Sequence, residues 1–236
     1  MPPRFYLDEP LDRPTATLAG AEAHHLTNVL RASPGDRVVL FDGRGTEALA
    51  EVAAVGRRTV ELNILDRRTT LDRRRPVILG TAVPKGDRFR WLVEKAAELG
   101  VARLVPLRTE RAVVDPAAGK LDKLRQTVIA ACKQCGINRL MAIEAVTPWG
   151  QFVDREISGR RTLIGVPGGP PFATELLAGS GDDPLVLAIG PEGDFTPSEV
   201  QQALDAGAQP VSLGPNLLRV ETAGIALAAL ALILQS

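Results

Sequence analysis

The chain has 236 residues, of which 45% are hydrophobic and 24% are charged, with 28 Lys and Arg side chains against 28 Asp and Glu. This length allows one large domain or two modest ones, and the composition excludes a wholly disordered or collagen-like chain. The net charge of zero at first argues against a nucleic-acid partner, because binding to a polyanion usually requires an excess of basic side chains.

The charges are distributed unevenly along the sequence. Residues 76–140 carry 12 basic and 6 acidic side chains, whereas residues 141–236 carry 4 basic and 11 acidic ones. Either these blocks form different surfaces of a polarised molecule, or they scatter over the fold and cancel locally. Arginine outnumbers lysine 23 to 5, which reflects either a GC-rich genome or a use for planar phosphate ligands.

The first part of the chain predicts a small barrel-like module. Short apolar or alternating runs at 4–7, 37–42, 47–55 and 59–65 are separated by turn signals and interrupted by one helical stretch at 21–32.

The charged segment 66–76 has no apolar pattern and predicts a linker, so we expect two domains, 1–70 and 71–236.

From Pro76 onward, apolar strands alternate with helices, which predicts a parallel sheet covered on both faces. We expect strands at 77–83, 101–107, 162–166, 185–189 and 209–213. We expect helices at 88–99, 120–135, 197–206 and 220–234, the third with a capping box formed by Thr196 and Glu199.

Targeting and redox signals are absent from the sequence. The longest apolar run, 223–234, is shorter than the roughly 20 residues that span a bilayer, and the N-terminus has no apolar signal region. The two cysteines provide no disulfide framework. We therefore expect a soluble protein of the reducing cytoplasm.

Two glycine-proline loops follow apolar strands in the second half, IGPEG at 189–193 and SLGPNLLRVETA at 212–223. Ligands bind at the carboxyl ends of parallel strands, where glycine lets the backbone approach closely. Tight turns and a surface pair capping the last helix explain the same residues without a ligand. Glu192 and Asp194 favour a neutral or cationic ligand over a nucleotide phosphate.

Other chemically suggestive residues have simpler interpretations. Cys132 and Cys135 lack further ligands for zinc and stand at the wrong end of a helix for a redox motif, so we expect no metal. His24 and His25 are either a general base or a helix-entry pair. The last helix is apolar nearly all round, which predicts burial in a core or a subunit interface.

The two loops together resemble the signature pair of the SPOUT methyltransferases and, more narrowly, of the ribosomal RNA small subunit methyltransferase E family. The resemblance covers the whole chain in the expected order. It includes RFYLDEPL (4–11), HHLTNVLRASPGDRVVLFDG (24–43), KGDRFRWLVEKAAELGV (85–101), PLRTER (106–111) and AACKQCGINR (130–139).

Three positions depart from the family pattern. Asp194 stands where a second glycine usually follows GPEG, Asn216 replaces an arginine, and Lys133 stands where glutamate is common. None of these changes removes a glycine expected to bind through its backbone.

The resemblance implies an α/β fold, with a PUA-like RNA-binding β-barrel followed by a SPOUT domain that has a parallel sheet and a deep trefoil knot. It also implies S-adenosylmethionine as methyl donor, N3 of a specific uridine in the 16S rRNA of the small ribosomal subunit as acceptor, and a homodimer with the site near the subunit interface. The alternatives are another SPOUT enzyme acting on tRNA or a 2′-hydroxyl, a non-catalytic RNA-binding protein on the same fold, and a nucleotide-phosphate enzyme.

On this interpretation Arg219 and Glu221 are the candidate catalytic residues. Arg219 would hold RNA phosphate or stabilise developing charge, and Glu221 would orient Arg219 or assist proton removal. The candidate cofactor-binding residues are Gly165, Val166, Ile189, Gly190, Pro191, Glu192, Gly193, Leu213, Gly214, Leu217, Leu218 and Arg219.

The candidate RNA contacts are basic side chains that would bind phosphates without reading sequence. They are Arg4, Arg31, Lys85, Arg88, Arg108 and Arg111, with further members of the track at Arg67, Arg68, Arg73, Arg74, Arg75, Arg90 and Arg103.

Overall fold

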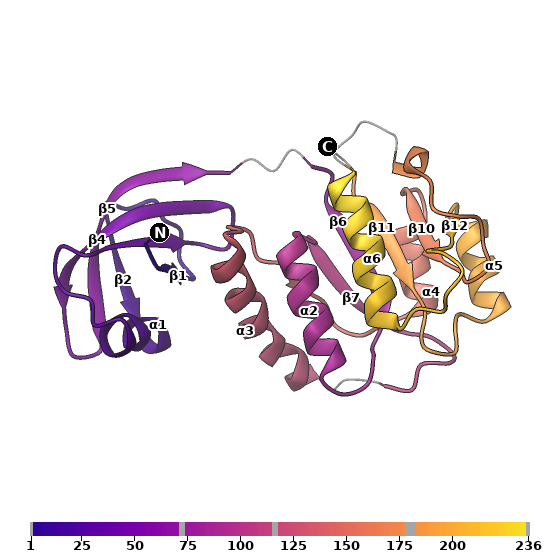
Figure 1. Ribbon diagram of the computed structural model, residues 1–236, viewed down its shortest axis with the longest axis horizontal. Coiled ribbons are helices and arrows are strands. Elements are labelled where there is room, and N and C mark those ends of the chain that lie inside the picture. Colours follow the sequence, from indigo (N-terminus) through magenta and orange to yellow (C-terminus); the bar gives the residue numbers. More distant parts are fainter. Residues whose placement is uncertain (1, 71–73, 115–117, 178–182, 235–236) are drawn as a thin grey trace. The chain divides into compact units, whose positions relative to one another are not determined.

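A computed structural model describes residues 2–70, 74–114, 118–177 and 183–234 of the chain (Figure 1). The chain forms two compact units, each with its own sheet. The first unit contains Met1–Asp72 together with Cys132–Leu140, and the second contains Arg73–Ala131 and Met141–Ser236.

The first unit is built on a five-stranded sheet of order β1-β3-β4-β5-β2. The strands are β1 (Arg4–Tyr6), β2 (Thr15–Ala19), β3 (Arg37–Phe41), β4 (Thr46–Val55) and β5 (Thr59–Thr69). Along β4 and β5 the buried residues alternate with more exposed ones, and Phe5, Leu40 and Leu62 are fully buried in the core of this unit. This is the expected pattern of strands that bury one face.

Three details of this unit differ from the sequence prediction. Strand β2 escaped prediction because only one of its residues, Leu18, is buried. The predicted helix is shorter and divides into α1 (Gly20–His24) and a π-helical turn, His25–Val29, in which the Leu30 N–H donates to the His25 carbonyl at 3.1 Å. Strand β5 runs through Thr69, so the prediction of a linker is wrong for residues 66–69.

A distant piece of sequence completes the first unit. The Leu140 N–H donates to the Gly43 carbonyl at 2.9 Å, and the Gly45 N–H donates to the Asn138 carbonyl at 3.0 Å. Lys133, one of the departures from the family pattern, lies 2.8 Å from a carboxylate oxygen of Glu22. The lysine is therefore stabilised by an acidic partner within the same unit.

The second unit is built on a parallel seven-stranded sheet of order β12-β10-β11-β6-β7-β8, with β9 also paired to β7. Its strands are β6 (Val77–Ala82), β7 (Arg103–Arg108), β8 (Ala142–Ile143), β9 (Thr147–Pro148), β10 (Thr162–Gly165), β11 (Leu185–Ile189) and β12 (Gln209–Val211). The prediction of a parallel sheet is confirmed.

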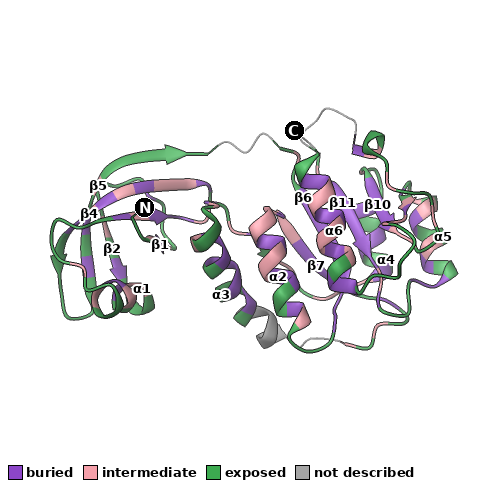
Figure 2. Cartoon of the chain, in the orientation of Figure 1, coloured by how far each residue is buried: buried purple, intermediate pink, exposed green. Residues whose placement is uncertain are grey.

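The helices of this unit are largely those that the sequence predicts. They are α2 (Arg88–Leu99), α3 (Ala118–Cys135), α4 (Trp149–Phe152) with a π-helical turn at Val153–Ile157, a 3₁₀ turn at Thr174–Leu177, α5 (Pro197–Asp205) and α6 (Val220–Ile233). Helix α5 begins with the expected capping box. Strands β6 and β11 are buried along their whole length, because helices cover both faces of the sheet (Figure 2).

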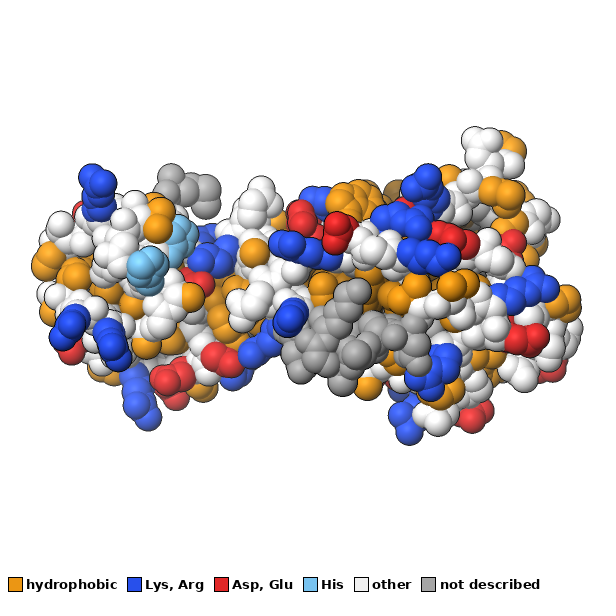
Figure 3. Space-filling model, turned by 90° about the horizontal axis from the view of Figure 1, so that it is seen from below, with side chains coloured by type: hydrophobic (Ala, Val, Ile, Leu, Met, Phe, Trp, Pro, Cys, Tyr) orange, Lys and Arg blue, Asp and Glu red, His pale blue; other side chains and the backbone are white. Residues whose placement is uncertain are grey.

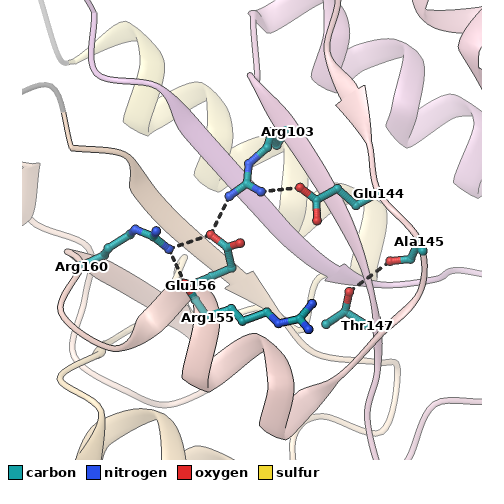
Figure 4. Close-up of polar contacts among 7 residues, drawn as sticks. All are labelled: Arg103, Glu144, Ala145, Thr147, Arg155, Glu156 and Arg160. Atoms are coloured by element: carbon teal, nitrogen blue, oxygen red, sulfur yellow. Dashed lines mark hydrogen bonds and ion pairs between the residues drawn. The ribbon is translucent and has the colours of Figure 1, made fainter.

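An ionic cluster joins the start of β7 to the segment before β10 (Figure 4). Glu156 is 9% exposed and accepts hydrogen bonds from Arg103 at 2.6 Å and Arg160 at 2.9 Å, while Arg103 also pairs with Glu144. Burial opposes the charge on Arg103, but the hydrogen bonds that its guanidinium donates to Glu156 and Glu144 raise its pKa. Arg103 thus holds the start of β7 against the segment before β10.

In the part of the chain that the structure describes, every helix is too short or too polar to cross a membrane.

Gly80 in β6 tests how tightly the centre of the sheet is packed. A Cβ there would lie 2.3 Å from the buried Phe152 ring, so Gly80→Ala should reduce the free energy of unfolding by about 1–3 kcal/mol. Gly150→Ala is the matched control: it adds the same methyl group to an exposed helix position with no atom within 4 Å, and should raise stability by about 0.5–1 kcal/mol. Denaturant unfolding measures both, and equal stabilities would contradict the packing.

Candidate cofactor pocket and its acidic loop

A pocket opens where β10, β11 and β12 end, with about 520 Å³ of empty space when the open solvent at its mouth is included. These three strands are neighbours in the sheet and run parallel, so their carboxyl ends meet at one edge. The loops that follow β11 and β12 provide most of the pocket wall, and Val220 and Ala223 of α6 complete it. This is the position at which open α/β sheets bind ligands.

Most of the predicted cofactor-binding residues line this pocket. They are Gly165, Val166, Ile189, Gly190, Pro191, Leu213, Gly214, Leu217 and Leu218. The pocket has further lining residues that the sequence did not predict as cofactor contacts. They are Pro167, Asp194, Val211, Ser212, Asn216, Val220 and Ala223. Two of these, Asp194 and Asn216, were visible in the sequence as departures from the family pattern.

At three positions of the pocket wall, close packing or backbone conformation favours glycine. A Cβ at Gly190 would lie 3.0 Å from the backbone nitrogen of Phe195, and a Cβ at Gly165 would lie 2.8 Å from Cδ1 of Ile189. Gly214 has φ +116°, a conformation that side chains rarely adopt. The wall therefore exposes backbone groups beside apolar side chains, which suits a ligand with a flat apolar ring and polar edges.

Glu192 and Gly193 lie outside the pocket lining and contact arginines instead. The Glu192 carboxylate is 3.0 Å from Nη2 of Arg88, the first residue of α2. The Gly193 carbonyl accepts a hydrogen bond of 2.7 Å from Nη1 of Arg111. Both arginines therefore hold the loop that follows β11, residues 190–196, which we call the acidic loop.

Glu221 is the most unusual carboxylate of this region. It is 6% exposed in the first turn of α6, and its Oε1 lies 3.7 Å from Nη1 of Arg88. Its Oε2 is buried without a hydrogen-bond partner among the described residues. Arg88 thus bridges Glu192 and Glu221, and it connects the starts of α2 and α6 to the acidic loop.

Arg219 lies apart from Glu221. It occupies the N-cap position of α6, its side chain is exposed, and it forms no ion pair within the described part of the chain. The expectation that Glu221 orients Arg219 is therefore not what the structure shows, since Glu221 pairs with Arg88. The sequence could not reveal this partner, which is 133 positions away.

The predicted RNA contacts divide into exposed and internal side chains. Arg31 and Lys85 are exposed, and Arg31 has a positive φ of 55°. Arg4 is instead committed to the first unit, where it pairs with Glu47 at 2.9 Å with a side chain only 11% exposed. Arg108 interacts with another group of the protein. Arg67 and Arg68 belong to β5, and Arg73 lies outside the described residues.

Acidic and basic side chains are mixed on the face drawn in Figure 3, where Lys and Arg do not form one continuous basic field among the described residues. This face shows local cancellation of charge, which was one of the two interpretations of the uneven charge distribution.

The cysteines and histidines form no obvious reactive site. Burial raises the pKa of the Cys132 thiol to about 12, so this residue is protonated at neutral pH, whereas Cys135 is exposed. The His24 ring contacts the side chain of Asn28, and the His25 ring packs against Phe5. Among the described residues, no three His, Cys, Asp or Glu side chains converge on a possible metal position.

Comparison with known proteins assigns both units. A family model described as an RNA methyltransferase domain matches residues 72–232, and one described as an RNA methyltransferase PUA domain matches residues 18–65. The chain is 34% identical over 228 residues to ribosomal RNA small subunit methyltransferase E of Synechocystis, covering 94% of this chain and 74% of that protein.

Solved structures of similar proteins share the whole architecture. A ribosomal RNA small subunit methyltransferase E from Neisseria gonorrhoeae, crystallised with bound S-adenosyl methionine, superposes with a TM-score of 0.82 at 33% identity, covering 97% of this chain and 96% of that chain. A probable rRNA methyltransferase from Porphyromonas gingivalis superposes with a TM-score of 0.85 at 32% identity, covering 99% and 98%. The chain therefore belongs to the ribosomal RNA small subunit methyltransferase E family, with a PUA domain followed by an RNA methyltransferase domain.

Proposed function

We propose that this protein transfers a methyl group from S-adenosylmethionine to N3 of a specific uridine in the 16S rRNA of the small ribosomal subunit. The observation that carries the proposal is the glycine-lined pocket at the ends of β10, β11 and β12. Similar proteins from Neisseria gonorrhoeae and Legionella pneumophila, at 33% and 29% identity, have been solved with this cofactor bound.

The pocket residues fit the cofactor in shape and in chemistry. Ile189, Leu213 and Leu217 provide apolar surface for an adenine ring, and the backbone at Gly190 and Gly214 provides hydrogen-bonding groups for its edges. When bound, S-adenosylmethionine supplies an electrophilic methyl group on a positively charged sulfur. No basic side chain lines the pocket among the described residues, so its lining does not repel that charge.

Arg219 is the residue that we propose to contact the substrate. It is exposed between Leu218 and Val220, which both line the pocket. Methylation at N3 requires loss of the N3 proton, which leaves negative charge on the uracil, and a nearby guanidinium stabilises that charge. Because Glu221 is buried against Arg88, we assign it a positioning role that acts through Arg88 and the acidic loop.

The N3 atom lies on the Watson–Crick edge, so the target uridine must be unpaired or turned out of its helix. We propose that the exposed Arg31 and Lys85 bind phosphates of the surrounding RNA, together with Arg108 at the end of β7 and Arg111 beside the acidic loop. These contacts position the RNA and leave selectivity to the structured target.

The proposal includes a homodimer and a deep trefoil knot in the second domain, as the family resemblance implies, and the cytoplasmic location that the sequence leads us to expect. Large apolar side chains support the dimer: Trp91 on α2 is 45% exposed, Ile233 on α6 is 64% exposed, and Leu217 beside the pocket is 82% exposed. Such residues are typical of surfaces that a partner covers.

Incubation with labelled S-adenosylmethionine and small subunits that lack the modification tests the reaction directly. We expect incorporation into 16S rRNA and 3-methyluridine as the labelled nucleoside. Another methylated nucleoside would refute the N3 assignment and retain the enzyme class. No incorporation into subunits, tRNA or free rRNA would refute methyl transfer.

Arg219→Ala tests the assignment of the substrate contact. We expect turnover to fall by about 100-fold, since removing one donor that stabilises transition-state charge typically costs that much, while cofactor affinity changes little. Arg219→Lys should recover part of the rate because it retains the charge. Arg155→Ala, an exposed residue outside the pocket lining and outside the candidate RNA contacts, is the control. Turnover near the wild-type value in Arg219→Ala would end this assignment.

Arg88→Ala tests the bridge between the acidic loop and α6. It leaves the buried Glu221 without its cation, so we expect a loss of about 1–3 kcal/mol in the free energy of unfolding, less than for a fully buried pair because Arg88 is 31% exposed. The double variant Arg88→Ala/Glu221→Gln should recover much of that loss, because the unpaired charge is gone. Denaturant unfolding beside the exposed Arg90→Ala control measures this, and equal stabilities of Arg88→Ala and Arg90→Ala would rule out the bridge.

A further inference from the structure

The pocket has a single ionisable residue among its described lining residues, Asp194. Its side chain is exposed, and it forms no ion pair within the described part of the chain. The other carboxylate of the loop, Glu192, lies outside the pocket lining and pairs with Arg88 at 3.0 Å, which it shares with Glu221. Among the described lining residues, Asp194 is therefore the one negative charge that the loop after β11 presents to the pocket.

The backbone at this position favours glycine. Asp194 has φ +57°, and its N–H donates to the Pro191 carbonyl at 2.9 Å in a tight turn. This left-handed conformation explains why the family pattern has glycine here, and Asp is among the few other residues that adopt it at small cost. The chain thus keeps the turn but adds a carboxylate where a hydrogen atom would suffice.

The start of helix α6 is a further electrostatic feature of the pocket, and its partial charge is positive. Helix α6 begins at the pocket with Val220, and the free N–H groups of a helix start favour negative charge. This helix end cannot account for a preference for a cationic ligand. Among the described lining residues, only Asp194 can provide one.

We propose that Asp194 is a specificity-determining residue that favours the positively charged methyl donor over its neutral-sulfur product, S-adenosylhomocysteine. The inference rests on the proposed function, because the two ligands differ by one methyl group and the charge on sulfur. A nearby carboxylate stabilises the sulfonium and leaves the neutral thioether almost unaffected. In this way the pocket assists exchange of product for fresh donor.

Calorimetric titration at low salt with both ligands tests the proposal. Asp194→Asn keeps the shape and tolerates the left-handed backbone, so we expect it to weaken S-adenosylmethionine binding about three- to fivefold, as for an exposed ion pair, and to change product binding less than twofold. The difference should shrink at high salt, since the charge is exposed. Asp154→Asn, an exposed residue outside the lining, removes the same charge and should change neither affinity.

A second variant separates charge from backbone conformation. Asp194→Gly also removes the carboxylate but relaxes the turn, so it should lose the same donor preference while raising thermal stability. Equal weakening of both ligands in Asp194→Asn, or no change in either, would overturn the role of the charge while the proposed function stands. A wild-type protein that binds neither ligand would instead overturn the proposed function and this inference with it.

Discussion

The parallel alignment of β10, β11 and β12 is the constraint on which the candidate site depends. Parallel neighbours end at the same edge of a sheet, so residues near 165, 190 and 214 meet although 20 or more positions separate them. Strand β11 is buried along its whole length and β10 along most of it, so neither can shift without exposing apolar surface. The pocket wall can therefore be made of loops that contain glycine and proline, because the strands beneath fix where each loop begins.

Contacts with two arginines hold the loop that follows β11 over the end of the sheet. The basic block of the sequence supplies Arg88 and Arg111, and the acidic block supplies the segment around Glu192 that both arginines contact. The two blocks thus meet within one unit, and part of the overall neutrality arises from these contacts. Two charged groups at the pocket remain available to a ligand: the unpaired carboxylate of Asp194 and the exposed guanidinium of Arg219.

The sequence predicted elements well wherever periodicity reflects burial. Helix α2 and strand β11 match their predicted bounds because their apolar residues face a core. Strand β2 and the π-helical turn were missed, since one buried leucine gives no period and a shifted hydrogen bond leaves no trace in composition. The loop glycines of the pocket could be predicted from motifs. The partners of Glu221 and Arg4 could not, because each is set by segments far apart in the chain.

The first unit is not a continuous piece of chain, and this affects how the protein is made. Its edge at Gly43 and Gly45 is hydrogen-bonded by Asn138 and Leu140, and Glu22 is paired by Lys133. During synthesis, the N-terminal sheet has to wait for some 70 further residues before these contacts form, although its strands are already complete. A fragment ending at residue 70 lacks this piece, so an exchange of PUA domains between relatives must carry the 132–140 segment along with the sheet.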